Sequence, residues 1–424
     1  MEIQSHPGIP IVFRHARVVL EDSIIENGAV AIAGGIIADV GETSQVSTQG
    51  AVVINANGAL LIPGLVDTHN DGVEREVNPR PRVGFSRPFA IANYARRAVA
   101  AGVTTSFHAV TFGNMVRNTR SVDEAVAITD AIREASTAGG IDHQVLHRCD
   151  VWSPDGIDNL FASMRRFQYQ AMSLNDHTPG QGQYRNLDGL KGLWGEYRQA
   201  GYNMGNDDDR LTQLMHERAA DTTTLPRVWG RAAEELSRQT YVLSSHDDDT
   251  PEKVDQMASI GCTISEFPVT TEAAARAREH GMKIIVGAPN VVRGGSTTGN
   301  ASALDLIKSG LADIICADYH SPSMLEAPFR VFDLGLRSLP GSIAMVTRDA
   351  AHAVGMVDRG VIRTGMRADL ALVVRTDGVA EATLVMRGGE IVHATRAGLK
   401  GLLPASVLAS RNGNATSFAE RAVH

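Results

Sequence analysis

One stretch marks a change of pattern in this chain, and it reads Pro63-Gly64-Leu65-Val66-Asp67-Thr68-His69-Asn70-Asp71. From here on, apolar runs of about five to eight residues are each followed by about ten or more residues with helical spacing. This alternation continues over roughly 300 residues and is typical of repeated βα units around a parallel sheet. Because functional side chains of such folds follow the carboxyl ends of the strands, the polar end of this stretch is a candidate site.

Eight apolar runs in this region have the length of strands, and eight strands predict a closed (β/α)8 barrel of the TIM type. They cover Leu65 to His69, Thr104 to Thr111, Gln144 to Val151, Ala171 to Asp176, Tyr241 to Ser245, Thr263 to Phe267, Lys283 to Val286 and Ile314 to Ala317. Helices are expected at Phe89 to Ala101, Ser121 to Ala138, Leu225 to Gln239 and Thr271 to His280. The long connection over residues 177–224 is expected to lie over one face of the barrel as a lid or substrate loop.

The two ends of the chain have a different pattern. Residues 11–62 and Gly360 to Val392 contain short β-type runs separated by turn signals. Neither end has enough alternating apolar surface to bury a core by itself, so we expect the two to pack together. We therefore expect a small β-sandwich domain of residues 1–62 and 360–400, a barrel of residues 63–359, and a polar C-terminal tail of residues 401–424.

The composition argues against several classes of protein. The chain has 424 residues, of which 43% are hydrophobic and 21% charged, and its formal net charge is −8. This acidic balance argues against a nucleic-acid partner. Every apolar run is interrupted before it could span a bilayer, and the first residues lack a signal-peptide pattern, so we expect a soluble cytoplasmic protein without a membrane partner. The three cysteines are widely spaced without a CxxC pair, which argues against a disulfide framework.

Polar residues recur at the ends of the predicted strands. His69 and Asp71 are two positions apart in extended backbone, so their side chains leave the same side of the strand and can bind one ion. An isolated His-x-Asp pair is weak evidence for a metal site, since solvated loops often contain one. His177, His246 and Asp318 each lie at a further predicted strand end. Together these residues supply the mixed imidazole and carboxylate ligands that divalent ions accept, with Zn²⁺ favoured and Mn²⁺ as the alternative.

Three groups of acidic residues have further candidate roles. Asp150 is the candidate bridge of a two-metal site, because two ions about 3.5–4 Å apart need a shared anionic group. The alternatives are a strand-end Asp that accepts backbone N–H groups, and Cys149 as the ligand instead. Asp318 is placed to bind a metal and to act as the catalytic base, unless it only caps the following helix. The run Asp247 to Asp249 is either a partner of a metal-bound histidine or a solvated turn.

Arginines cluster in two loops after predicted strands. One loop reads Asn78-Pro79-Arg80-Pro81-Arg82, and the other reads Gly287-Ala288-Pro289-Asn290-Val291-Val292-Arg293-Gly294-Gly295-Ser296. Guanidinium groups match phosphate oxygens, and a Gly-Gly-Ser turn lets backbone N–H groups approach a phosphate. Either loop by itself is usually a solvated turn. The candidate substrate-binding residues are Arg80, Arg82, Asn290, Arg293 and Ser296.

Several blocks of the chain resemble known families. The stretch from Pro63 to His69, together with Gly365-Met366-Arg367-Ala368-Asp369-Leu370, resembles the amidohydrolase superfamily. Further blocks resemble, within it, the family of ribose 1-methylphosphonate 5-triphosphate diphosphatases of the carbon–phosphorus lyase pathway. These blocks are His69-Asn70-Asp71 with Asn78-Pro79-Arg80-Pro81, His147-Arg148-Cys149-Asp150, Asp176-His177-Thr178-Pro179-Gly180-Gln181, Ser245-His246-Asp247-Asp248, Ser265-Glu266-Phe267-Pro268, Gly287 to Ser296, and Asp318-Tyr319.

The resemblance implies a hydrolase that removes pyrophosphate from the 5-triphosphate of a ribose phosphonate, a small phosphorylated sugar. It also implies two divalent metal ions, Asp318 as the base, and arginines that neutralise the departing pyrophosphate. A homodimer is expected on the same ground. Two features depart from the family pattern: Asp150 stands where the family usually has Glu, which is one methylene longer, and residues 72–76 and the C-terminal tail also differ.

Two other functions fit parts of the pattern. The same fold and metals could cleave a C–N bond of an N-acyl amino acid or a cyclic amide. Against this, no strand-end lysine is apparent for a carboxylated bridge, and Arg80, Arg82 and Arg293 favour phosphate. A non-catalytic barrel would not be expected to retain all of the ligand candidates together. The sequence therefore predicts a diphosphatase first and an amide hydrolase second.

Overall fold

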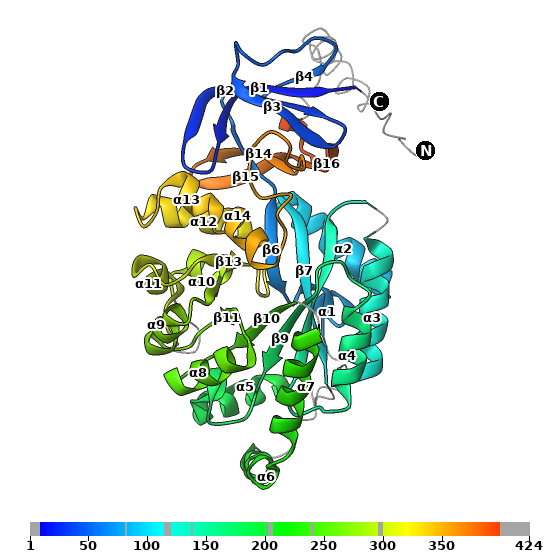
Figure 1. Ribbon diagram of the computed structural model, residues 1–424, viewed down its shortest axis with the longest axis vertical. Helices are drawn as coiled ribbons and strands as arrows, with labels where there is room; N and C mark the ends of the chain where they lie inside the picture. Colours follow the sequence, from blue (N-terminus) through cyan, green and yellow to red (C-terminus); the bar gives the residue numbers. More distant parts are fainter. Residues whose placement is uncertain are drawn as a thin grey trace, which may run out of the picture. The chain divides into compact units, whose positions relative to one another are not determined.

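The computed structural model describes residues 9–80, 83–113, 120–136, 139–199, 201, 207–238, 241–295 and 300–398. The chain divides into two compact units (Figure 1). The terminal unit is made of Met1–Gly64 and Val361–His424, and the barrel unit is Leu65–Gly360. The C-terminal tail predicted for residues 401–424 lies outside the described residues.

The barrel unit contains eight strands that pair in parallel in the order of the sequence, which confirms the predicted barrel fold. They are β6 (Leu65–Asn70), β7 (Val103–Phe112), β8 (Asp142–Asp150), β9 (Ala171–Asn175), β10 (Val242–His246), β11 (Ile264–Glu266), β12 (Lys283–Gly287) and β13 (Ile314–Cys316). Every residue of β6 and β7 is buried. Continuous burial is expected of parallel strands that are covered on both faces, and it explains why the strands read as apolar runs in the sequence.

The barrel closes between its last strand and its first. Asp318 forms a parallel bridge with Asn70, its amide donates to the carbonyl of His69 at 2.9 Å, and its carbonyl accepts the amide of Asp71 at 2.8 Å. The buried carboxylate of Asp67 adds a side-chain link, because its Oδ1 accepts the amide of Ala317 at 2.8 Å. The seam therefore brings the ends of β6 and β13 together at the residues predicted to bind metal.

Helices surround the barrel, and most follow a strand directly (Figure 1). They are α1 (Gly72–Val77), α2 (Arg87–Ala100), α3 (Val122–Ala135), α4 (Gly156–Met164), α5 (Leu187–Gln199), α6 (Asp207–Ala220), α7 (Thr224–Arg238), α8 (Pro251–Ile260), α9 (Thr271–Glu279), α10 (Ala288–Arg293), α11 (Ala303–Lys308), α12 (Ser323–Asp333), α13 (Leu339–Ala344) and α14 (Arg348–Ala353). Side-chain caps begin several of them, as where Ser121 accepts the amide of Glu124 at the start of α3.

The segment predicted as a long loop over residues 177–224 is largely helical, which corrects that prediction. It contains a short 3-10 helix (Gly182–Tyr184) followed by α5 and α6. Leu190, Trp194 and Leu211 form a small apolar cluster of their own. The pattern was missed because α5 contains three glycines, which lower helix propensity by about 1 kcal/mol each relative to alanine, and because the apolar set is small.

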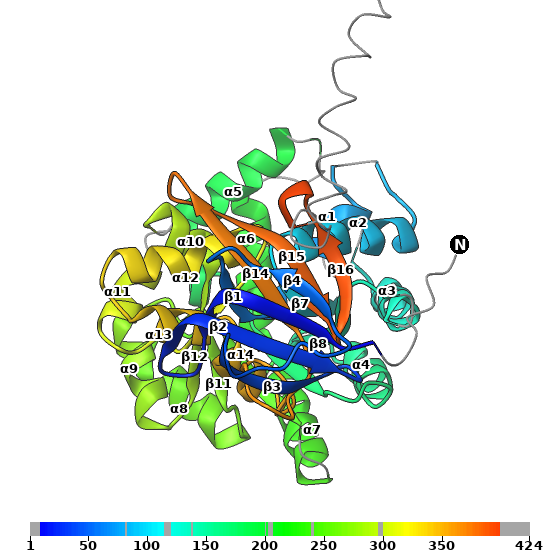
Figure 2. The ribbon, with the colours of Figure 1, turned by 90° about the horizontal axis from the view of Figure 1, so that it is seen from above.

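The terminal unit is one mixed sheet built from both ends of the chain, as the fold prediction required (Figure 2). Its strands are β1 (Ile11–Val19), β2 (Ile24–Ala33), β3 (Ile36–Glu42), β4 (Val52–Asn55), β5 (Leu60–Pro63), β14 (Leu370–Thr376), β15 (Val379–Arg387) and β16 (Glu390–Ala394). The two ends meet where β5 pairs antiparallel with β14. Phe13, Leu61, Leu372 and Leu384 belong to one buried cluster, so each end supplies apolar surface that the other needs.

No helix within the described ranges is both long enough and apolar enough to cross a membrane.

A buried ion pair in the barrel unit gives a test of its stability. Arg359 is 2% exposed, and its Nη1 donates to Asp142 Oδ2 at 2.6 Å and to Thr105 Oγ1 at 2.9 Å. Arg359→Met removes this charged partner from Asp142, and we expect a loss of about 3 kcal/mol of unfolding free energy. Thermal unfolding followed by circular dichroism would show a lower midpoint. The double variant R359M/D142N should recover most of the loss, and an unchanged midpoint in R359M would contradict the prediction.

Candidate active site

Two groups of metal-ligating side chains meet at the carboxyl ends of the barrel strands. His69, His246 and Glu266, from β6, β10 and β11, have ligand atoms within 4.8 Å of one another. His177, His246 and Asp247 form a second group by the same measure, so His246 belongs to both. This is the end of a (β/α)8 barrel at which active sites are found.

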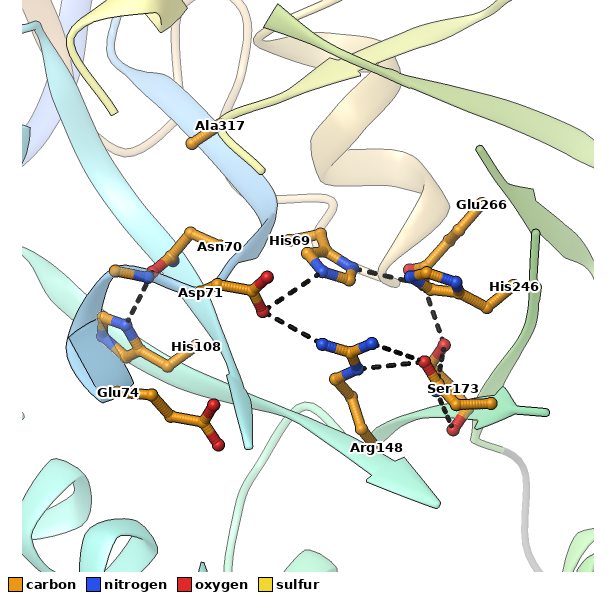
Figure 3. A network of polar contacts seen from close by, with 12 residues as sticks. His69, Asn70, Asp71, Glu74, His108, Arg148, Ser173, His246, Glu266 and Ala317 are labelled. Carbon is orange, nitrogen blue, oxygen red and sulfur yellow. Dashed lines mark hydrogen bonds and ion pairs between the residues drawn. The ribbon is translucent and has the colours of Figure 1, made fainter. Parts of the chain in front are cut away.

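His69 lies between two carboxylates (Figure 3). Its Nδ1 is 3.2 Å from Glu266 Oε2, and its Nε2 is 3.7 Å from Asp71 Oδ1. The edge of its ring meets Phe267, with 5.1 Å between the ring centroids. The ring is therefore held in one orientation by contacts on both nitrogens and by the T-shaped contact with Phe267.

A closed ring of polar contacts links residues at the ends of four strands, β6, β8, β9 and β11 (Figure 3). Arg148 of β8 donates to Asp71 Oδ1 at 3.0 Å and, through Nε and Nη2, to Asn175 Oδ1 at 3.0 and 2.7 Å. Asn175 Nδ2 donates to Ser173 Oγ, which donates to Glu266 Oε2 at 2.8 Å. Since Glu266 and Asp71 both contact His69, the ring returns to its start, and the position of each member depends on the others.

Unsatisfied buried atoms indicate that the second group fits a cation. Within the described part of the chain, His177 Nδ1, His246 Nδ1 and Asp247 Oδ2 are buried and have no hydrogen-bond partner. His246 Nδ1 and Asp247 Oδ2 lie 2.8 Å apart without forming a hydrogen bond. Leaving such groups unpaired is costly, and a divalent ion bound by imidazole and carboxylate would satisfy them. The residues present therefore fit a metal ion of this kind.

The electrostatics of the site favour the charged forms of both His69 and Asp71, a protonated imidazole beside an ionised carboxylate. Although burial alone would lower it, Glu266 and Asp71 raise the pKa of His69 to about 10. Burial also acts against ionisation of Asp71, but the charge of Arg148 and the hydrogen bond from His69 hold its pKa well below the usual range. Burial lowers the pKa of His177 to about 3, so this imidazole is neutral at pH 7, the form that binds a metal.

Three strand ends at the site have strained backbone. Asp247, Phe267 and Asp318 have φ angles of 56°, 55° and 53°. Side chains other than glycine adopt this left-handed region at a cost of about 1 kcal/mol or more. The strain turns the chain sharply after β10, β11 and β13 and so aims the polar side chains that follow these strands.

Asp318 lies at the closing seam with its carboxylate against the start of α10. A Cβ added to Gly287 would be 3.2 Å from Asp318 Oδ2, which shows how closely this backbone approaches the carboxylate. Burial, together with the negative charge of Asp71, raises the pKa of Asp318 to about 7. Glycine at position 287 thus gives the Asp318 carboxylate the room that it occupies.

Sequence comparison identifies the family. No family model matches the chain. The α-D-ribose 1-methylphosphonate 5-triphosphate diphosphatase of Escherichia coli (strain K12) is 32% identical over 391 residues, which cover 90% of this chain and 100% of that protein. The chain belongs to this diphosphatase family. The chain is a metal-dependent hydrolase homologous to this diphosphatase, and the His and Glu side chains described above are the candidate metal ligands.

Several solved structures share the fold. An enamidase described as a member of the amidohydrolase superfamily has a TM-score of 0.58 at 12% identity, covering 91% of this chain and 98% of its own. The ochratoxinase of A. niger has a TM-score of 0.56 at 15% identity, covering 92% and 96%. The 5-methylcytosine deaminase of Klebsiella pneumoniae has a TM-score of 0.57 at 12% identity, covering 91% and 98%. Identities this low support the barrel fold alone.

The predicted metal ligands fall into two sets, those that belong to a metal-capable group and those that do not. His69, His177 and His246 belong to the metal-capable groups, while Asp71 contacts His69 and Asp318 pairs with the main chain of β6. Asp150 is in neither group, and its Oδ1 accepts the amide of Trp152 at 3.1 Å. Cys149, the alternative ligand, is buried and also in neither group.

The predicted substrate-binding residues are more widely distributed. Arg80 lies in the loop after α1 and is exposed, as is Arg293 in the last turn of α10. Asn290 is half-buried in the same helix. Arg82 and Ser296 lie outside the described residues. The role of this set stays a prediction.

Three residues of the site were not among the predicted ligands: Glu266, Asp247 and Arg148. Glu266 ends a predicted strand, so its position was visible, but its partner His69 is 197 positions away in the sequence. Asp247 belonged to an acidic run that was interpreted either as a partner of a metal-bound histidine or as a solvated turn. The structure places it in the group with His177 and His246. Its neighbour Asp248 is instead buried and accepts hydrogen bonds from Ser245 and Ser265.

Glu266 gives the first test of the metal site. Glu266→Gln removes the negative charge beside His69 and leaves a side chain of the same size. We expect the affinity for Zn²⁺ to fall by about 10- to 100-fold, the range found when partners of metal ligands are lost. Equilibrium dialysis with metal analysis measures it, and E272Q, an exposed glutamate of α9, is the matched control. Equal affinities in E266Q and the unaltered protein would refute a role of Glu266 at the metal.

Proposed function

We propose that this protein is a divalent-metal-dependent diphosphatase that hydrolyses α-D-ribose 1-methylphosphonate 5-triphosphate to the 5-monophosphate and pyrophosphate, as a step of phosphonate breakdown. The observation that carries the proposal is the pair of metal-capable groups that share His246, beside the Asp318 carboxylate at the barrel seam. The full-length similarity to the diphosphatase of Escherichia coli supports this substrate class.

Two divalent ions are proposed as cofactors, with zinc favoured and manganese as the alternative. His69, Asp71, His177, His246 and Asp318 would hold them. Asp150 would be the shared anionic group between them, since two neighbouring ions need one. The family resemblance also suggests a dimer. When bound, such ions supply a water of lowered pKa and offset the negative charge of the phosphates. Imidazole and carboxylate ligands are compatible with both metals, so the ligand set does not discriminate between zinc and manganese.

The proposed reaction transfers one phosphoryl group to water. The oxygen of water attacks the α-phosphorus, the bond from this phosphorus to the oxygen that bridges to the β-phosphorus breaks, and its electron pair leaves with pyrophosphate. Asp318 accepts the proton of the attacking water at a carboxylate oxygen. Its place is secured because the amide and carbonyl of Asp318 are both bonded to β6. The proposed proton acceptor is thus positioned by main-chain pairing, which costs no reorganisation during the reaction.

The phosphate chain would be bound by the cationic loops. Arg80, Arg82 and Arg293, with Asn290 and Ser296, are proposed to contact phosphate oxygens as the reaction proceeds. Guanidinium groups make bidentate, charge-assisted hydrogen bonds to phosphate, and such contacts strengthen when charge builds on the departing pyrophosphate. The helix that presents Asn290 and Arg293 begins beside Asp318, which supports a place near the substrate for this set.

Phosphorus NMR tests the proposed reaction. We expect the zinc- or manganese-loaded protein to convert ribose 1-methylphosphonate 5-triphosphate to a 5-monophosphate with release of pyrophosphate, and to act more slowly on a nucleoside triphosphate. D318N should lower kcat at least about 100-fold, because the proton acceptor is lost. Bound metal without any phosphorus product from either compound would disprove the proposal and favour the C–N hydrolase alternative, to be screened with N-acyl amino acids and cyclic amides.

The number of bound ions tests the role of Asp150. If its carboxylate bridges two ions, Asp150→Asn should lower the metal content from about two ions per chain to about one, because a neutral amide is a poor bridge. D150E, with the longer side chain expected in this family, should retain two. Metal analysis after gel filtration measures the content. The same count in D150N as in the unaltered protein would leave Asp150 the role of accepting the Trp152 amide.

A further inference from the structure

An arginine in the helical insertion stacks on an aromatic ring beside the site. The guanidinium carbon of Arg218, on α6, lies 4.1 Å from the ring centroid of Trp152. The ring is fixed, because Trp152 Nε1 donates to Asp176 Oδ1 at 2.9 Å and to Thr178 Oγ1 at 2.8 Å. Trp152 follows Asp150 by two positions, and Asp176 directly precedes His177. The stack therefore belongs to the ends of β8 and β9, next to the metal-capable groups.

The stacked guanidinium has no anionic partner in the described part of the chain. Arg218 forms no ion pair or hydrogen bond there, although it is half-buried. Burial lowers the pKa of Arg218, and the charges of Asp150 and Asp176 act in the opposite direction, so two carboxylates are near without contact. Two other arginines at this end of the barrel do have carboxylate partners: Arg148 pairs with Asp71, and Arg120 pairs with Glu74.

Such an arrangement is suited to binding phosphate. Stacking on an indole occupies the face of the guanidinium and leaves its edge of N–H donors directed away from the ring. A half-buried cation without hydrogen bonds is unfavourable, and a doubly charged phosphate group would satisfy several donors at once. A carboxylate side chain could do the same, but none among the described residues reaches Arg218.

We propose that Arg218, held on the Trp152 ring, binds the β- and γ-phosphates of the substrate and the pyrophosphate that leaves. This inference rests on the proposed function for the identity of the phosphate chain. The α-phosphorus must lie at the metal-capable groups, where water attacks. Arg218 belongs to the inserted helix α6, seen with α5 and α7 at the bottom of Figure 1. Its stack on Trp152 lies at the ends of β8 and β9 and is in neither metal-capable group, so we assign it to the part of the phosphate chain that departs.

Isothermal titration of the metal-loaded protein with inorganic pyrophosphate tests the subsite. Arg218→Gln should weaken pyrophosphate binding by about tenfold or more, because a charge-assisted bidentate contact is lost. R218K, which keeps the charge without the planar fork, should lie between R218Q and the unaltered protein. R227Q, at an exposed arginine of the next helix, is the matched control and should bind as the unaltered protein does. Metal content is measured before and after each titration, since pyrophosphate chelates metals.

Ribose 5-phosphate and thermal unfolding separate the subsite from other roles of Arg218. Binding of ribose 5-phosphate and the unfolding midpoint should be the same in R218Q and in the unaltered protein. The subsite is overturned if pyrophosphate does not bind or if R218Q binds it normally. It is also overturned if R218Q loses affinity for ribose 5-phosphate as strongly as for pyrophosphate. Pyrophosphate binding that needs Arg218, in a protein that hydrolyses no triphosphate, would refute the proposed function and keep the subsite. Normal hydrolysis with an unchanged KM and unchanged pyrophosphate affinity in R218Q would refute the subsite and keep the proposed function.

Discussion

The site depends on how the barrel closes. The main chain of Asp318 pairs with His69 and Asp71 on either side of Asn70, and Asp67 adds a side-chain link to the amide of Ala317. This seam is buried, and burial raises the pKa of the Asp67 carboxyl to about 6. The carboxylate is nevertheless supplied with hydrogen bonds from Ser106 and Tyr94. These hydrogen bonds hold the residues that follow the first and last strands of the barrel close together.

The alternation of β6 distributes its polar residues between two layers. His69 and Asp71 point into the barrel, and Asn70 between them points outward, where its Nδ2 donates to Ser106 Oγ and to the carbonyl of Phe107. Asn70 Oδ1 accepts the amide of Gly72, which starts α1. The outer layer thus satisfies its own hydrogen bonds and holds the strand end, while the inner layer keeps nitrogen and oxygen atoms directed at the site.

Charge balance explains why the inner layer can hold so many ionisable groups. Asp71 and Glu266 lie on opposite sides of His69, and Arg148 links Asp71 to the ring of contacts through Asn175 and Ser173. No single pair compensates a buried charge here; the closed ring does so. The second group lacks such compensation, because Asp247 and His177 retain unpaired atoms within the described structure. The second group is therefore the one whose unpaired atoms a bound cation would satisfy.

The sequence by itself determined the elements and the direction in which their polar ends point. All eight strands begin and end within two residues of their predicted limits, because both faces of a parallel strand are buried and apolar residues therefore concentrate in the strands. The helices α5 and α6 escaped prediction, since three glycines weaken the local signal in α5. Only the tertiary structure decided which strand ends share a site. Glu266 reaches His69 across 197 positions, whereas Asp150 joins neither metal-capable group. Strand order and closure bring such residues together, and contacts between distant segments depend on the register and twist of the whole sheet, which no local pattern of residues contains.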